Sequence, residues 1–132
     1  MQSNTVKGRM RSRSLLALYM NRENIIEVLQ QIALKSVQID IYEEKQISNI
    51  PAYLLKQWEE YYRPDKLGFD EEFTENELKQ MNCFTDFFLV RVKSFPTEFS
   101  ELLKDPYWSS VCEYAGEILK DFEKKGEQSV RQ

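Results

Sequence analysis

The chain has 132 residues, of which 42% are apolar and 13% aromatic, so it has enough material for the core of one domain. It contains no histidine, which excludes Ser-His-Asp and Cys-His catalysis and the usual helical zinc sites. Its four glycines are too scattered for a phosphate-binding loop, and no acidic stretch has the spacing of a calcium loop. We therefore expect a protein that is not an enzyme and has neither a metal site nor a cofactor.

The composition also indicates the fold class. Four glycines and four prolines leave few of the turns that β-hairpins need. We predict an all-α fold, a single irregular bundle of five or six helices around a central helix at about residues 74–93. No run of about 20 apolar residues is present, and the two cysteines stand singly, which gives no disulfide framework. These features favour a cytoplasmic protein without a membrane contact.

In chain order, the sequence divides into a flexible basic arm at residues 1–12, one helical domain at residues 13–126 and a frayed tail at residues 127–132. The arm is polar and lacks periodicity. Met10 could begin the protein as well as the first residue, so whether residues 1–9 are native stays open.

Two helical elements are predicted to follow the arm. The first is a short piece at residues 14–20, and the second starts near Asn21 or Asn24, either of which could cap it. The apolar face of this second helix comprises Ile25, Leu29 and Ile32. Residues 37–42, VQIDIY, alternate like a strand but also fit a continued helix. We prefer a helix because a lone strand has no partner elsewhere in the chain.

A third helix is predicted from Pro51, which suits a first helical turn, to a point before Pro64. Residues 65–73 then form a loop that contains Gly68 and a cluster of acids. This loop leads into the predicted central helix.

The central helix begins with a capping box, because Thr74 is followed three residues later by Glu77. Beyond the cap, apolar residues recur at steps of three and four, which is the period of an amphipathic helix. Pro96 ends the helix. Cys83 lies beside the apolar face, and we expect it and Cys112 to be buried, inert thiols.

The last part of the chain is also predicted to be helical. A short helix at residues 97–104 precedes a long one, for which Asp105 is the cap and Pro106 occupies the first turn. We expect Gly126 to end this helix.

Charge is distributed unevenly along the sequence. Residues 1–22 carry five basic side chains and no acid, whereas residues 59–77 carry eight acids and two bases. Aromatic rings are interspersed with these acids, and rings anchor many protein interfaces while acids steer basic partners. Burial of the same rings in the core is the alternative. The predicted partner-binding residues are Trp58, Glu59, Glu60, Tyr61, Tyr62, Phe69, Asp70, Glu71, Glu72 and Phe73.

The sequence thus predicts a non-catalytic protein that binds a basic protein, for example as an acidic inhibitor of the immunity-protein or antitoxin type. The alternative is a regulatory or nucleic-acid-associated protein that uses its basic N-terminal arm. Direct nucleic-acid binding is disfavoured because the rest of the chain is acidic. A small enzyme using paired carboxylates ranks third. The oligomeric state is not specified by the sequence.

Overall fold

The computed structural model describes the backbone of residues 21–131 and the side chains of residues 21–123. Residues 21–33 form a first helix, followed by α2 (Lys35–Glu44), α3 (Ile50–Tyr61), η1 (Phe69–Glu72), α4 (Glu75–Arg91), η2 (Val92–Ser94), α5 (Phe99–Leu102) and α6 (Pro106–Arg131), where η denotes a short 3-10 helix. No strand occurs in residues 21–131, and the predicted all-α class is confirmed. The predicted arm at residues 1–12 and helical piece at residues 14–20 lie outside the described residues.

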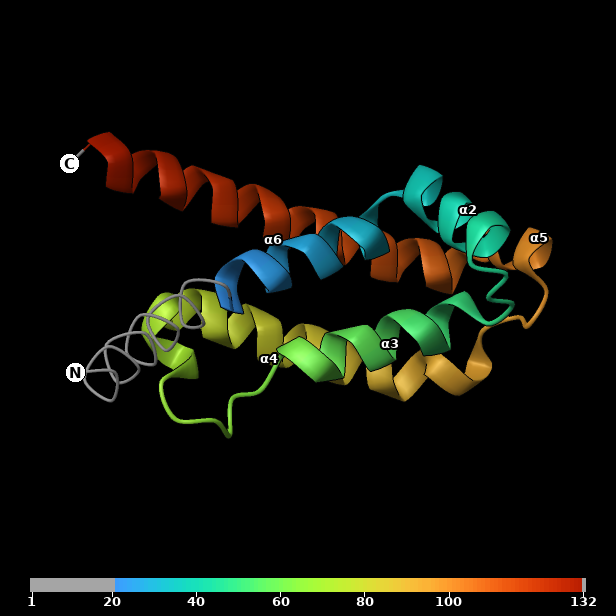
Figure 1. Ribbon diagram of the computed structural model, residues 1–132, viewed down its shortest axis with the longest axis horizontal. Helices are drawn as coiled ribbons and strands as arrows, with labels where there is room; N and C mark the ends of the chain where they lie inside the picture. Colours follow the sequence, from blue (N-terminus) through green and yellow to red (C-terminus); the bar gives the residue numbers. More distant parts are fainter. Residues whose placement is uncertain (1–20, 132) are drawn as a thin grey trace, which may run out of the picture.

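The long helices pack in two layers (Figure 1). The first helix lies beside α6, and α3 lies along α4. The layers meet where α4 packs against α6. At one end of the molecule α2 and α5 come together, and the rings of Tyr42 and Phe99 stack there with centroids 4.4 Å apart. The helices therefore enclose a core between the two layers.

Aromatic rings fill much of that core. Trp58, Phe84, Phe88 and Trp108 have no exposed surface. Phe84 meets Trp58 edge to face at 5.1 Å, and the centroids of Phe88 and Trp108 are 5.8 Å apart. Aromatic pairs of this kind contribute about 0.5–1.5 kcal/mol each beyond the burial of their area. A row of rings thus joins α3, α4 and α6.

Local signals in the sequence set several helix starts. The predicted capping box is present: the Glu77 N–H donates to Thr74 Oγ1 at 3.1 Å, and the Thr74 N–H donates to Glu77 Oε1 at 2.8 Å. Before α3, Asn49 Oδ1 accepts the Ala52 N–H at 3.1 Å. Before α6, Asp105 Oδ2 accepts the N–H of Trp108 at 2.9 Å. Each cap satisfies a backbone donor that the helix itself leaves unpaired.

A buried glutamine ties α2 to α6. Gln38 has no exposed surface, and its Oε1 accepts the indole N–H of Trp108 at 3.0 Å. Its Nε2 donates to the carbonyl oxygen of Ile32 at 2.8 Å and to Cys112 Sγ at 3.5 Å. Leaving one of these buried groups unsatisfied would cost about 1–3 kcal/mol. Residues 37–42 lie within α2, so the preference for a helix over a strand is confirmed.

Two predicted helix boundaries are wrong. Asn21 and Asn24 already lie within the first helix, so neither is its N-cap. At the other end of the chain, α6 continues through Gly126 to Arg131. A glycine inside a helix costs only about 1 kcal/mol relative to alanine, and it ends a helix only where the chain turns into the left-handed conformation.

The predicted burial of Cys83 is also wrong. The buried face of α4 is formed by Glu77, Met81, Phe84 and Phe88. Cys83 precedes Phe84 by one residue, which is about 100° of rotation, and this places its thiol on the exposed side. Cys112 is buried as predicted.

Candidate protein-binding surface

Three of the predicted interface rings lie in the core instead of on the surface. Trp58 is fully buried, and Phe69 and Phe73 are 1% and 8% exposed. The indole N–H of Trp58 donates to Thr85 Oγ1 at 2.8 Å, so its polar atom is also satisfied internally. The prediction that these rings face a partner is therefore wrong, because α3 and η1 bury them against other helices.

The buried rings have a structural role, since they hold η1 against the rest of the protein. Phe69 lies edge to face with Tyr62 at 5.7 Å and is 5.0 Å from Phe73. Phe73 in turn is 6.1 Å from Phe122 on α6. Burying a phenylalanine contributes about 1.5–3 kcal/mol. The segment between α3 and α4 is thereby fixed in place.

The two predicted tyrosines are partly buried. Tyr62 stacks on Trp58 with a centroid distance of 5.3 Å. Burial raises the pKa of Tyr62, and the nearby groups Asp86 and Cys83 add to the shift. Tyr61 and Tyr62 thus keep some contact with solvent, unlike the other three rings.

Four of the predicted acids are exposed: Glu59 and Glu60 near the end of α3, and Asp70 and Glu71 in η1. We call these four residues the acidic surface. Within residues 21–123, none of them forms an ion pair. The ring contact between Tyr62 and Phe69 connects the end of α3 to η1, so both pairs of carboxylates come from adjoining elements.

A neighbouring acid is already neutralised. Asp65 forms an exposed ion pair with Arg63 at 3.3 Å. The hydrogen bond from Arg63 lowers the pKa of Asp65. Asp65 is therefore less available to an incoming cation than the acidic surface.

Glu72 was predicted to bind a partner, but it makes an internal contact with Arg22 instead. The backbone N–H of Arg22 donates to Glu72 Oε1 at 3.2 Å, and Arg22 Nη1 donates to the carbonyl oxygen of Glu72 at 3.1 Å. Burial nevertheless raises the pKa of Glu72, because it outweighs the hydrogen bonds from Arg22 and Asn21. Glu72 thus faces the first helix.

The same arginine binds a second acid, Glu77, which is fully buried. Arg22 Nη1 and Nη2 each lie 2.8 Å from a carboxylate oxygen of Glu77, in a bidentate ion pair. The guanidinium also lies 4.7 Å from the ring centroid of Phe122 and 5.7 Å from that of Phe73. Arg22 therefore joins the first helix, η1, α4 and α6.

Reasoning from the sequence missed this contact. It counted Arg22 among the five bases of residues 1–22, and Glu77 as a capping residue and one of the acids of residues 59–77. The two residues are 55 positions apart, and nothing in the local pattern links them. The capping glutamate was the available signal, because a carboxylate at that position faces back toward the chain that precedes its helix.

The described residues contain neither a cluster of metal ligands nor a membrane-spanning helix. No group of three or more cysteine, aspartate or glutamate side chains there is arranged to hold a metal ion. Within the same residues, no helix is both long and apolar enough to cross a membrane.

Comparison with known proteins gave no match: no family, no characterised protein and no solved structure shows significant similarity to this chain.

Proposed function

We propose that this protein is a non-catalytic binding protein whose acidic surface contacts a basic protein. The observation that carries the proposal is the exposure of Glu59, Glu60, Asp70 and Glu71 without an ion pair in residues 21–123. Unpaired carboxylates on adjoining elements create a negative field that attracts cations. A partner with a lysine- and arginine-rich site would be attracted by this field.

The buried rings make the acidic surface rigid. Because Trp58, Phe69 and Phe73 are in the core, they stiffen the surface from below instead of inserting into the partner. A preorganised surface loses little conformational freedom on binding. The partly exposed Tyr61 and Tyr62 are the aromatic groups left to contact the partner. Electrostatic steering is then the main contribution, and it acts on the association rate.

An inhibitor of a basic enzyme is the form of this function that we favour. A positively charged active site, such as that of a nuclease, would be covered by a rigid acidic surface of this kind. The chain's net charge of −4 agrees with such a role. The alternative function, binding through the basic arm, is not favoured by any observation on residues 21–131, and Arg22 belongs to the folded body.

The test compares proteins captured from native cells by three forms of the full chain. The double variant D70K/E71K reverses two charges of the acidic surface. The matched control E43K/E44K makes the same change at the end of α2, where both acids are exposed. We expect the wild type and the control to retain a basic protein that D70K/E71K loses. With the purified partner, the association rate of D70K/E71K should fall about tenfold at low salt.

Folding must be checked in parallel. The melting temperature of D70K/E71K should stay close to that of the wild type, because both side chains are exposed. Capture of the same proteins by all three forms would refute the acidic surface as the binding site. Loss of binding only when residues 1–13 are deleted would support the basic arm instead.

A further inference from the structure

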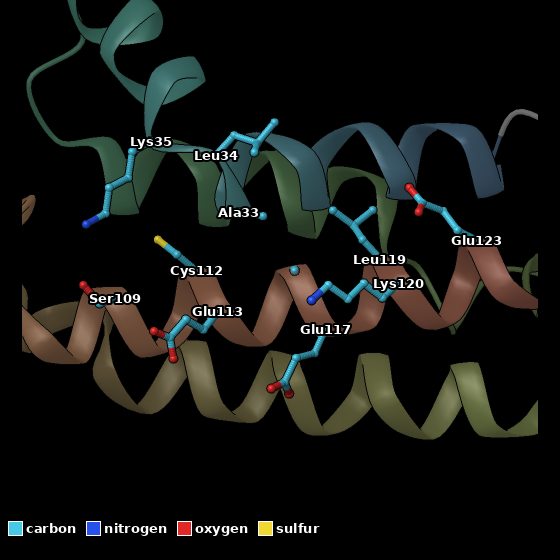
Figure 2. A pocket seen from close by; sticks show the side chains of 11 residues that line it. Ala33, Leu34, Lys35, Ser109, Cys112, Glu113, Glu117, Leu119, Lys120 and Glu123 are labelled. Carbon is cyan, nitrogen blue, oxygen red and sulfur yellow. The ribbon is translucent and has the colours of Figure 1, made fainter.

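Two pockets of the structure differ in the charges that line them. A trough of about 610 Å³ lies between the C-terminal end of the first helix and α6 (Figure 2). Side chains of both signs line this trough, namely Lys35 and Lys120 as cations and Glu113, Glu117 and Glu123 as anions. Because the acids outnumber the lysines and the two signs are mixed along α6, the trough does not favour an anionic ligand.

The second pocket, of about 560 Å³, lies between α3 and the segment that follows α4. Its apolar lining consists of Ala52, Leu55, Val92 and Phe95, and Leu55 and Phe95 are only 9% and 7% exposed. Ligand sites in proteins are commonly pockets of about 300–1,000 Å³ that combine apolar walls with a few polar groups. The size and lining of this pocket therefore suit a small molecule with an apolar body.

Two lysines from different elements line this second pocket. Lys56 belongs to α3, and Lys93 belongs to η2. Both side chains are exposed, and within residues 21–123 neither forms an ion pair. The whole chain has a net charge of −4, so a pair of lysines at one apolar pocket is a local exception. Their ammonium groups remain available to an anion.

Glu59 is the third charged residue that lines the pocket, and it lies one helical turn beyond Lys56 on α3. Two cations and one anion leave the lining with a net charge of +1. The single charge of a carboxylate matches this value. A doubly charged phosphate would be repelled more strongly by Glu59. The charges of the lining thus favour a monoanion.

We propose that this pocket binds a small carboxylic acid with an apolar body, in its ionised form. Lys56 and Lys93 hold the carboxylate between α3 and η2, since a lysine ammonium attracts an anion as a point charge. Leu55 and Phe95 provide apolar contact for the rest of the ligand. This site does not depend on the proposed binding of a basic protein, because its test uses small molecules alone.

A fluorescent dye provides the first test. Anilinonaphthalene sulfonate combines an apolar aromatic body with one negative charge, and it fluoresces more strongly on apolar protein surfaces. We expect the folded full chain to bind one dye molecule saturably. Octanoate should displace the dye, because it has the same combination of an apolar body and one negative charge. Octanol at the same concentration should not displace it, since octanol has no charge to pair with the lysines.

Paired charge variants test which residues hold the anion. K56Q/K93Q removes both lysines of the pocket and should weaken dye and octanoate binding about tenfold or more. The matched control K79Q/K104Q removes two exposed lysines that do not line the pocket, and it should bind like the wild type. All four side chains are exposed, so far-UV circular dichroism should show every variant to be folded.

Two further variants separate charge from shape. E59Q removes the only acid that lines the pocket, so it should strengthen octanoate binding about threefold. A52F keeps both lysines and Glu59 but places a ring in the pocket, where the exposed Ala52 leaves space. A52F should therefore lose octanoate binding although all the charges are retained.

Four outcomes would overturn the proposal. The first is a wild type that shows no saturable binding of the dye, and the second is equal displacement of the dye by octanol and octanoate. The third is the same affinity for octanoate in K56Q/K93Q and K79Q/K104Q. The fourth is undiminished octanoate binding by A52F, which would place the ligand outside this pocket.

Discussion

Replacing Arg22 with methionine removes the guanidinium that is paired with the buried carboxylate of Glu77. The change eliminates two charge-assisted hydrogen bonds of 2.8 Å and the bond from Nη1 to the carbonyl oxygen of Glu72. Methionine keeps apolar contact with the two neighbouring phenylalanine rings. The variant therefore isolates the charge of Arg22 from its packing.

The expected loss of stability follows from the burial of the pair. Removing one partner of a buried ion pair costs about 3–5 kcal/mol, because the other charge stays desolvated. The side chain of Glu77 is 0% exposed, but that of Arg22 is 26% exposed, so water already weakens the interaction. We expect a loss of about 3 kcal/mol, the lower end of that range. For a domain of this size, this corresponds to a fall in melting temperature of about 12 °C.

Urea and thermal unfolding of the full chain, followed by far-UV circular dichroism, measure this loss. A second substitution tests its cause. E77Q keeps an oxygen that can accept the N–H of Thr74 but removes the charge that Arg22 binds, so it should destabilise R22M less than it destabilises the wild type. A loss below about 1 kcal/mol for R22M would refute the reasoning. So would destabilisation by E77Q of equal size in both backgrounds.

Two further predictions concern the thiols and Glu72. In the native protein at about pH 8, a disulfide reagent should modify the exposed Cys83 rapidly and Cys112 only on unfolding, because burial raises the pKa of Cys112 and shields its sulfur. Similar rates for both thiols would contradict the packing of α6. Because the pKa of Glu72 is raised in the folded state, folding favours its protonated form, and its contribution to stability is lost as the pH rises through the folded pKa. E72Q should therefore raise the melting temperature at neutral pH and have a smaller effect below about pH 4. A lower melting temperature at pH 7 would contradict this account.

The sequence by itself determined the fold class and several helix boundaries. The capping box of Thr74 and Glu77, the Asn49 cap and the Asp105 cap depend on residues three positions apart, so the local sequence specifies them. Periodicity at helical spacing likewise marks which positions of a helix are apolar. Caps and periodicity involve residues that are only a few positions apart, so they do not depend on how the helices pack together.

Only the tertiary structure decided which of these groups reach the surface. From the sequence, Trp58 fitted both an interface and a core, and the packing of α3 on α4, which places Thr85 and Phe84 beside it, decides for the core. Arg22, which the sequence showed only as one of five bases in residues 1–22, is the partner of Glu77, 55 residues away. The physical reason is that burial and ion pairing depend on distances between helices, and these distances arise only when all helices pack together.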